Sequence, residues 1–187
     1  MANLSAGMLN SSYYDLASRK LVFNAYAAVT APVIYTTAAG TGGPLLWNGS
    51  VQGGPHQVNA VILGVTCALS VVSTVAAALG ITGNSGQSTA PATTTPITSV
   101  GNNWVGGPPS LCTTYSVGTP TNAGNFFLPL IQLGTGPLTV ADNTLGFIDL
   151  AGMVIVPPNS WISIAASATA TTTVAALGLI WAEVPIL

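Results

Sequence analysis

Residues Val58–Thr82 read VNAVILGVTCALSVVSTVAAALGIT, a long run without a charged side chain. Val, Ile and Thr are abundant in it, and these residues favour strands over helices. In an extended chain, alternate residues point to opposite faces. The core face would then carry Val61, Leu63, Val65, Cys67, Leu69 and Val71. The outer face would carry the smaller or more polar Ala60, Ile62, Gly64, Thr66, Ala68 and Ser70. We therefore predict a sheet with one core face and one tightly packed outer face.

The same run is long enough to form a membrane-spanning helix, which is the alternative interpretation. No Lys or Arg flanks the run to orient such a helix, and the rest of the chain is nearly as poor in charge. The strand interpretation is therefore preferred, and we expect no membrane partner.

Outward from this run, further β-prone segments alternate with Gly- and Pro-rich turns. The last two, Trp161–Ala170 and Val174–Val184, are expected to form a hairpin. Helical stretches are scarce, and residues 84–110 are too rich in Pro, Gly and Thr for a regular element. The other segments are Leu21–Val29, Val33–Thr37, Phe126–Leu133, Leu138–Ala141 and Gly146–Val156.

About eight strands with long connections favour an antiparallel jelly-roll sandwich over an up-and-down barrel. The predicted fold class is all-β. Residues 21–187 form one jelly-roll domain with a long Pro/Gly/Thr loop near 84–110, and residues 1–20 form an extended N-terminal arm.

Charge is the most unusual property of the composition. Only 3% of the 187 residues are charged, the net charge is -2, and the only two basic residues are Arg19 and Lys20. Two adjacent cations cannot neutralise a run of phosphates, which excludes nucleic acid as a partner. A surface so poor in charge is not expected to stay apart from copies of itself. We therefore expect self-association, with a three-fold arrangement bringing apolar strand faces together.

The residues that usually carry chemistry are few. Cys67 and Cys112 form no disulfide framework and no metal-ligand cluster, so both are expected to be buried free thiols, and no metal or cofactor is expected. His56 lies alone in a loop, and Ser85 in Gly83-Asn-Ser-Gly86 lacks the following glycine of a nucleophile elbow. Asp142 and Asp149 could pair for acid–base chemistry, but Asp142 is more typical of a turn. We predict that the chain is not an enzyme, with no catalytic residue.

Two further groups of residues have structural interpretations. Asp15 and Arg19 would pair across one turn if the N-terminal segment is a short helix. If it is an arm, Arg19 and Lys20 could contact an acidic patch on a partner, together with Tyr13 and Tyr14. Glu183 would need a partner if it were buried, because an unpaired buried carboxylate is strongly unfavourable.

The C-terminal part carries a resemblance. Met153-Val-Ile-Val-Pro-Pro-Asn-Ser-Trp-Ile-Ser-Ile-Ala-Ala-Ser-Ala168, followed by Ala176-Leu-Gly-Leu-Ile-Trp-Ala-Glu-Val-Pro185, resembles the C-terminal strands of jelly-roll virion proteins of tailed phages. The resemblance is confined mainly to these strands. It implies a capsid decoration (cement) protein that forms a homotrimer on the major capsid protein and lies on the capsid surface of the virion.

A second function is compatible with the same fold. A jelly-roll head domain of a phage fibre would bind a glycan or receptor through exposed loops. Trp47, Trp104 and Tyr115 would then contact the sugar. An exposed apical end would distinguish this head domain from a shell protein that is covered around its perimeter.

Overall fold

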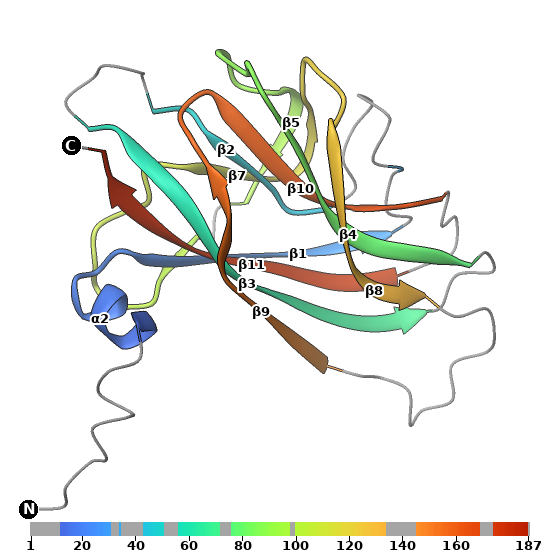
Figure 1. The fold of residues 1–187 in the computed structure, drawn as a ribbon, viewed down its shortest axis with the longest axis horizontal. Helices are drawn as coiled ribbons and strands as arrows, with labels where there is room; N and C mark the ends of the chain where they lie inside the picture. The colour runs from blue at the N-terminus through green and yellow to red at the C-terminus, as the bar shows by residue number, and fades with distance from the viewer. Residues whose placement is uncertain are drawn as a thin grey trace, which may run out of the picture.

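The computed structural model describes residues 12–30, 34, 43–50, 56–71, 76–97, 100–133, 145–168 and 174–186 (Figure 1). The regular structure of the described residues is almost entirely β-strand, as predicted, with one short helix. The elements are α2 (Ser12–Ser18), β1 (Val22–Thr30), β2 (Leu45–Asn48), β3 (Val58–Val71), β4 (Ala77–Ser85), β5 (Ala92–Pro96), β6 (Gly101–Asn102), β7 (Thr113–Thr119), β8 (Phe126–Leu133), β9 (Leu145–Val156), β10 (Ser160–Ala166) and β11 (Val174–Pro185).

The strands form two sheets, and all pairings between these named strands are antiparallel. Sheet A has the order β6-β1-β11-β3-β9, and sheet B has the order β5-β7-β2-β10-β4-β8. Consecutive strands therefore often lie in different sheets: β1 and β2, β3 and β4, β8 and β9, and β10 and β11. The prediction of an all-β protein with antiparallel sheets is confirmed.

The main hydrophobic core lies between the two sheets. Sheet A contributes Ile62, Leu179 and Trp181, and sheet B contributes Leu79 and Ile164, all at most 2% exposed. The rings of Phe23 on β1 and Trp181 on β11 stack with their centroids 5.9 Å apart. This stacking contact joins the first and the last strand, β1 and β11.

The expected C-terminal hairpin is wrong. β10 pairs with β2 and β4 in sheet B, whereas β11 pairs with β1 and β3 in sheet A. Alternation within each strand cannot show this, because it reports which residues share a face and not which strand is the neighbour. The connection between β10 and β11 crosses from one sheet to the other.

The predicted core face of β3 is correct only for its second half. Val65, Cys67 and Leu69 belong to the inter-sheet core, but before them it is Ala60 and Ile62 that point inward. The pairing of β3 with β9 shifts between Ile62 and Gly64, so an irregularity in the ladder reverses the alternation. The reversal turns Val61 and Leu63 to the outer face of sheet A.

Residues 84–110 contain more regular structure than predicted. The short strands β5 and β6 lie within this stretch, each at the end of a sheet in the described residues. Edge positions tolerate Pro96, because a residue without an N–H can still lie on an unpaired side. High Pro and Gly content therefore did not exclude strands here.

The run that could have been a membrane helix contains β3 and most of β4. In the parts of the chain that are described, no helix is both long and apolar enough to cross a bilayer.

Candidate functional site

Helix α2 packs against the outer face of sheet A. Leu16 and Ala17 contact a small cluster formed by Val22, Leu63 and Ala182. Beside it, the hydroxyl of Tyr13 donates a hydrogen bond to the Asp149 carboxylate on β9, which also accepts the N–H of Ala151 at 2.8 Å. Residues 12–18 therefore lie on the chain's own sheet; residues 1–11 of the expected arm are outside the described residues.

The contact between Tyr13 and Asp149 changes the pKa of both side chains. The hydrogen bond from Tyr13, followed by that from Ala151, lowers the pKa of Asp149 below its ordinary value of 3.8. Burial, followed by the nearby carboxylate, raises the pKa of Tyr13 above 10.0. The neutral phenol and the ionised carboxylate are thus the favoured pair.

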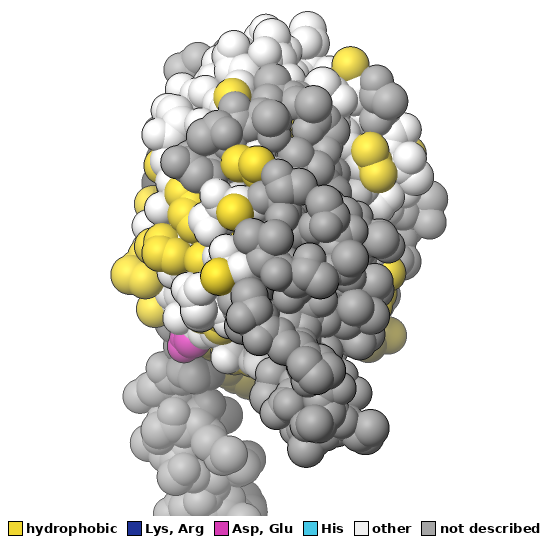
Figure 2. Space-filling view, turned by 90° about the vertical axis from the view of Figure 1, so that its right-hand side faces the viewer, with side chains coloured by type: hydrophobic (Ala, Val, Ile, Leu, Met, Phe, Trp, Pro, Cys, Tyr) yellow, Lys and Arg dark blue, Asp and Glu magenta, His cyan; other side chains and the backbone are white. Residues whose placement is uncertain are grey.

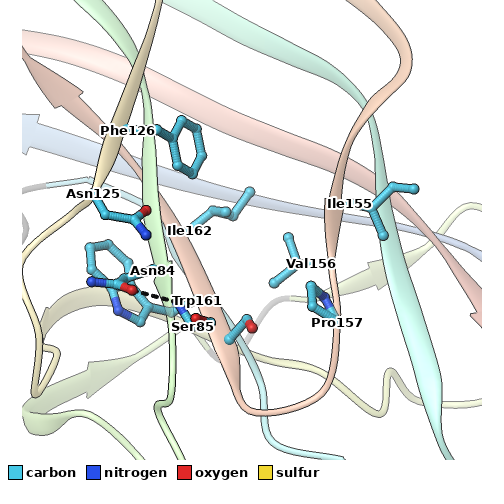
Figure 3. A pocket seen from close by; sticks show the side chains of 10 residues that line it. Asn84, Ser85, Asn125, Phe126, Ile155, Val156, Pro157, Trp161 and Ile162 are labelled. Atoms are coloured by element: carbon cyan, nitrogen blue, oxygen red, sulfur yellow. Dashed lines mark hydrogen bonds between the residues drawn. The ribbon is translucent and has the colours of Figure 1, made fainter.

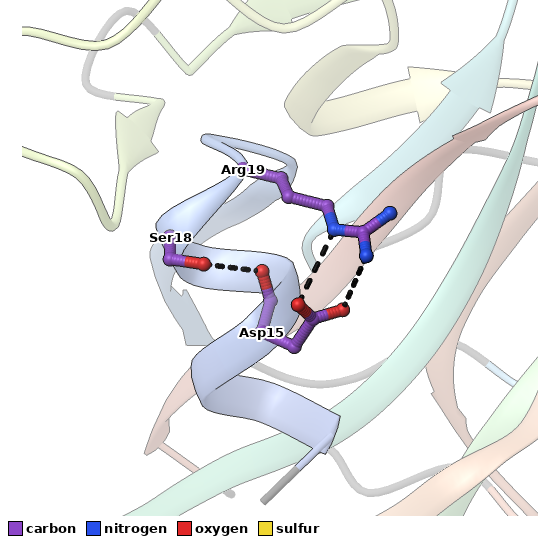
Figure 4. Close-up of polar contacts among 3 residues, drawn as sticks. All are labelled: Asp15, Ser18 and Arg19. Carbon is purple, nitrogen blue, oxygen red and sulfur yellow. Dashed lines mark hydrogen bonds and ion pairs between the residues drawn. The ribbon is translucent and has the colours of Figure 1, made fainter. Parts of the chain in front are cut away.

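The other three residues predicted to contact a partner lie on the surface around α2. Arg19 pairs with Asp15 at 3.2 Å across one helical turn, and Ser18 donates to the Asp15 carbonyl oxygen at 2.8 Å (Figure 4). The Lys20 ammonium lies 5.8 Å from the centroid of the Trp104 ring. Tyr14, Arg19 and Lys20 are exposed, whereas Tyr13 is half-buried in its intramolecular contact. The helix alternative for the pairing of Asp15 with Arg19 is the one observed.

Beyond α2, the outer face of sheet A is poor in charge, and its acidic side chain is the exposed Asp149 of β9. Register aligns Tyr26, Gly178, Thr66 and Phe147 in one row across β1, β11, β3 and β9. Tyr26 and Phe147 are more than half exposed. A Cβ on Gly64 would lie 2.4 Å from the Phe147 ring, so this ring lies directly over the glycine backbone. We call this row the aromatic row.

The outer face continues along the edge strand β9. Met153 and Ile155 alternate with the inward Val154 and are 72% and 57% exposed. The space-filling view shows hydrophobic side chains gathered toward one side of the molecule, with an acidic side chain at its lower margin (Figure 2). Large exposed apolar side chains on a surface without salt-bridging charge are typical of interaction surfaces.

A pocket of about 190 Å³ opens between the two sheets on the side of β8 and β9. Its apolar wall includes Phe126 from β8, Ile162 from β10 and Val156 from β9, whose side chain points toward Ile162, whereas that of Ile155 points away (Figure 3). Its polar lining includes Ser85, Asn125 and Ser160, with Asn84 beside them.

The polar groups of this pocket differ in how they are used. Asn84 is already engaged: its amide donates to the Ala123 carbonyl oxygen at 2.6 Å and accepts the Ser85 N–H at 2.7 Å. By contrast, the hydroxyl of Ser160 has no hydrogen-bond partner, although the residue is only 5% exposed. Native proteins leave few buried polar groups unpaired, so this hydroxyl needs an explanation.

Glu183 is buried, and its carboxylate has the hydrogen-bond partners that a buried carboxylate was expected to need. Its carboxylate accepts the N–H groups of Leu111 at 2.9 Å and Cys112 at 3.0 Å and the hydroxyl of Ser110 at 2.5 Å. The indole N–H of Trp181 lies at 3.3 Å. Backbone and hydroxyl donors therefore compensate the buried charge without a cation.

The residues considered for catalysis do not meet. Ser85 lines the pocket, whose lining contains neither His56 nor a carboxylate, and His56 is exposed in a turn. Asp149 is engaged with Tyr13, and Asp142 lies outside the described residues. Cys67 and Cys112 are free and buried, as predicted. No group of three or more potential metal ligands occurs within the described ranges.

The three aromatic residues proposed to contact sugar are separated. Tyr115 and Trp47 pack with Leu45 and Trp161 in a cluster on sheet B, and Trp47 donates to the Gln87 carbonyl oxygen at 2.9 Å. Only Trp104 is exposed, on the opposite edge of sheet A from β9. The pocket was not found from sequence, because its residues come from four separate segments.

No protein-family model matches this chain, and comparisons with curated proteins and with solved structures found no match.

Proposed function

We propose that this chain is a structural virion protein, a capsid decoration (cement) protein that forms a homotrimer on a phage head. The observation that carries the proposal is the outer face of sheet A, which is poor in charge and exposes Tyr26, Phe147 and Met153 beyond α2. The acidic side chain on it, Asp149, is engaged by Tyr13 of α2. Covering such a face with another subunit removes apolar surface from water at little cost in charge desolvation.

The strand order supports a jelly-roll topology. Without β5, β6 and β7, sheet A has the order β1-β11-β3-β9 and sheet B the order β2-β10-β4-β8, which is the order expected of two interlocked Greek keys. On this interpretation, β5, β6 and β7 are an insertion between β4 and β8. Viral capsid proteins are among the proteins that use this architecture, although a fold alone does not define a function.

The scarcity of charge supports assembly independently. Six charged residues serve a chain with 9400 Å² of accessible surface, and one of the six, Glu183, is buried. A protein that functions as a monomer in solution normally carries many charged surface residues of both signs. Burial of faces against copies of the chain and against the capsid accounts for this composition.

A second contact would join the trimer to the major capsid protein. α2 carries the exposed Tyr14, and the exposed Arg19 and Lys20 follow its last residue, Ser18. Arg19 and Lys20 are the two basic residues of the whole chain, and we call this end of α2 the basic corner. We assign them to an acidic patch on the capsid surface, where complementary charge would set the orientation of docking.

Sedimentation of the purified protein tests the assembly. The wild-type protein is expected to sediment at three times its 18.7 kDa chain mass. Met153→Lys and Phe147→Lys place a charge on the proposed interface and should shift the protein toward the monomer. Val105→Lys is the matched control, because Val105 is 96% exposed on a loop away from β9. A monomeric wild-type protein at micromolar concentration would refute the proposal.

Co-sedimentation with empty shells of the cognate major capsid protein tests the second contact. The double variant Arg19→Gln/Lys20→Gln should remain trimeric but bind shells weakly at low salt. The difference from the wild-type protein should shrink at high salt, which screens the contact made by the two cations. Shell binding that equals that of the wild-type protein at every salt concentration would exclude the basic corner as the docking site.

The alternative function is a glycan- or receptor-binding head domain of a phage fibre. The pocket between β8 and β9 favours this alternative, because it combines polar and apolar groups in a concave site. A head domain would bind cells without binding shells, so the co-sedimentation experiment separates the two functions.

A further inference from the structure

The pocket between β8 and β9 contains an unused buried polar group. Ser160 is 5% exposed, it lines the pocket, and its hydroxyl has no hydrogen-bond partner. Leaving such a group unpaired is unfavourable, whereas a ligand that bonds to it regains that loss. The hydroxyl is therefore positioned for something that enters the pocket.

The rim of the pocket is held in place before any ligand arrives. Asn84 on β4 bonds to the Ala123 carbonyl oxygen, and the Asn125 N–H donates to the Gly83 carbonyl oxygen at 2.9 Å. These bonds hold the segment before β8 against β4, and the Asn125 side chain points toward Ile162 across the opening (Figure 3). A preorganised rim reduces the ordering cost of binding.

The chemistry of the lining selects a neutral ligand rich in hydroxyl groups. No charged side chain lines the pocket, which argues against phosphate, carboxylate or ammonium ligands. The Ser85 and Ser160 hydroxyls and the Asn125 amide can both donate and accept hydrogen bonds. Phe126, Val156 and Pro157 offer an apolar wall beside them. A sugar ring presents hydroxyl groups at its edge and C–H groups on its faces, which fits both kinds of lining.

The volume limits the size of the ligand. The pocket has a volume of about 190 Å³. This volume lies below the usual range for drug-sized ligands. We propose that the pocket binds one ring of a neutral saccharide, with Ser160 and Asn125 as its hydrogen-bonding residues. The proposal rests on the pocket alone and does not depend on assembly into a virion.

Titration followed by ¹H–¹⁵N NMR tests the site. D-glucose, D-galactose, D-mannose and N-acetyl-D-glucosamine are each added to the wild-type protein up to about 50 mM, well above a millimolar dissociation constant. At least one sugar should give saturable shifts in the amide signals of Ser85, Asn125 and Ser160. The Trp104 indole signal, from the opposite edge of sheet A, should not move. Absence of saturable shifts with all four sugars, or shifts confined to Trp104, would overturn the proposal.

Variants separate binding from folding. Ser160→Ala and Asn125→Ala should each weaken binding about fivefold, the effect of losing one hydrogen bond. Ser160→Ala should leave the urea midpoint unchanged or raise it, because it removes an unpaired buried hydroxyl. Asn122→Ala is the control, since Asn122 is an exposed asparagine in the same segment but does not line the pocket. Unchanged affinity in Ser160→Ala, or a lowered urea midpoint, would contradict the assigned role of its hydroxyl.

A substituent on the anomeric oxygen distinguishes two possible ligands, a free monosaccharide and the terminal ring of a longer glycan. The methyl glycoside of the best monosaccharide mimics a terminal ring within a longer glycan. Equal affinity for the methyl glycoside supports recognition of a glycan end, and binding of only the reducing sugar supports a free monosaccharide.

Discussion

The backbone N–H of Cys112 donates a hydrogen bond of 3.0 Å to the carboxylate of Glu183, which lies 71 residues later in the chain. Together with Leu111 and Ser110, this contact ties the loop before β7 to strand β11. Sheet B is thereby connected to sheet A by a buried charged group rather than by apolar packing alone.

Removing this carboxylate should destabilise the fold. Glu183→Ala leaves the N–H of Leu111 without an acceptor and the N–H of Cys112 with only the Ser110 hydroxyl, so it should lower the free energy of unfolding by about 2 to 3 kcal/mol. Glu183→Gln keeps one carbonyl acceptor and should lose less. Urea unfolding followed by tryptophan fluorescence measures both. Asp15→Asn is the control, because it breaks an exposed ion pair and should change little. Equal stabilities for Glu183→Ala and Asp15→Asn would show that the contact is dispensable.

Replacing Trp181 should destabilise the fold more than replacing Trp104, His56 or Ser85. The side chain is fully buried, stacks on Phe23 and reaches Glu183, so Trp181→Ala should cost about 3 to 5 kcal/mol and unfold the domain or block assembly. Trp104→Ala removes an exposed ring and should leave the melting temperature nearly unchanged. His56→Ala and Ser85→Ala should likewise leave folding and assembly intact. A stable, assembling Trp181→Ala protein would contradict the core position of β11.

Acid should weaken the contact between α2 and sheet A. The folded-state pKa of Asp149 lies below its ordinary 3.8, so its contribution to stability is fully present above that pH and is lost as the pH falls through the lower folded value. Tyr13→Phe removes the largest cause of this shift. Urea midpoints measured from neutral pH down to about pH 2 should show a difference between wild type and Tyr13→Phe that shrinks at the acid end. A difference that is constant with pH would mean that Asp149 is not the group involved.

Both thiols should be unreactive in the native protein. Burial raises the pKa of Cys67 to about 11, and burial followed by the Glu183 carboxylate raises that of Cys112 well above 9.0. The thiolate is the reactive form, so neither residue should react readily with Ellman's reagent at pH 8 until urea unfolds the chain. Rapid labelling of one thiol under native conditions would indicate that its strand opens locally.

The amino-acid sequence by itself determined the class of fold and the character of the surface. β-branched residues, alternation and Gly/Pro turns indicated antiparallel strands, because these properties act between neighbours in the chain. Burial of Cys67, Cys112 and Trp181 followed from their apolar character. The need of Glu183 for a partner followed from the cost of burying a charge, but its donors at residues 110–112 lie too far away in sequence to be identified.

Only the tertiary structure decided which strands pair and which side of β3 faces the core. The ladder irregularity near Leu63 reverses the alternation, so Ile62 points inward and Leu63 lies beneath α2. β10 and β11 follow each other in the chain but belong to different sheets. The pocket around Ser160 exists for the same reason, because β4, β8, β9 and β10 are brought together by long-range pairing. Side-chain periodicity is local, whereas strand partners, ladder irregularities and concave sites arise from contacts between distant segments.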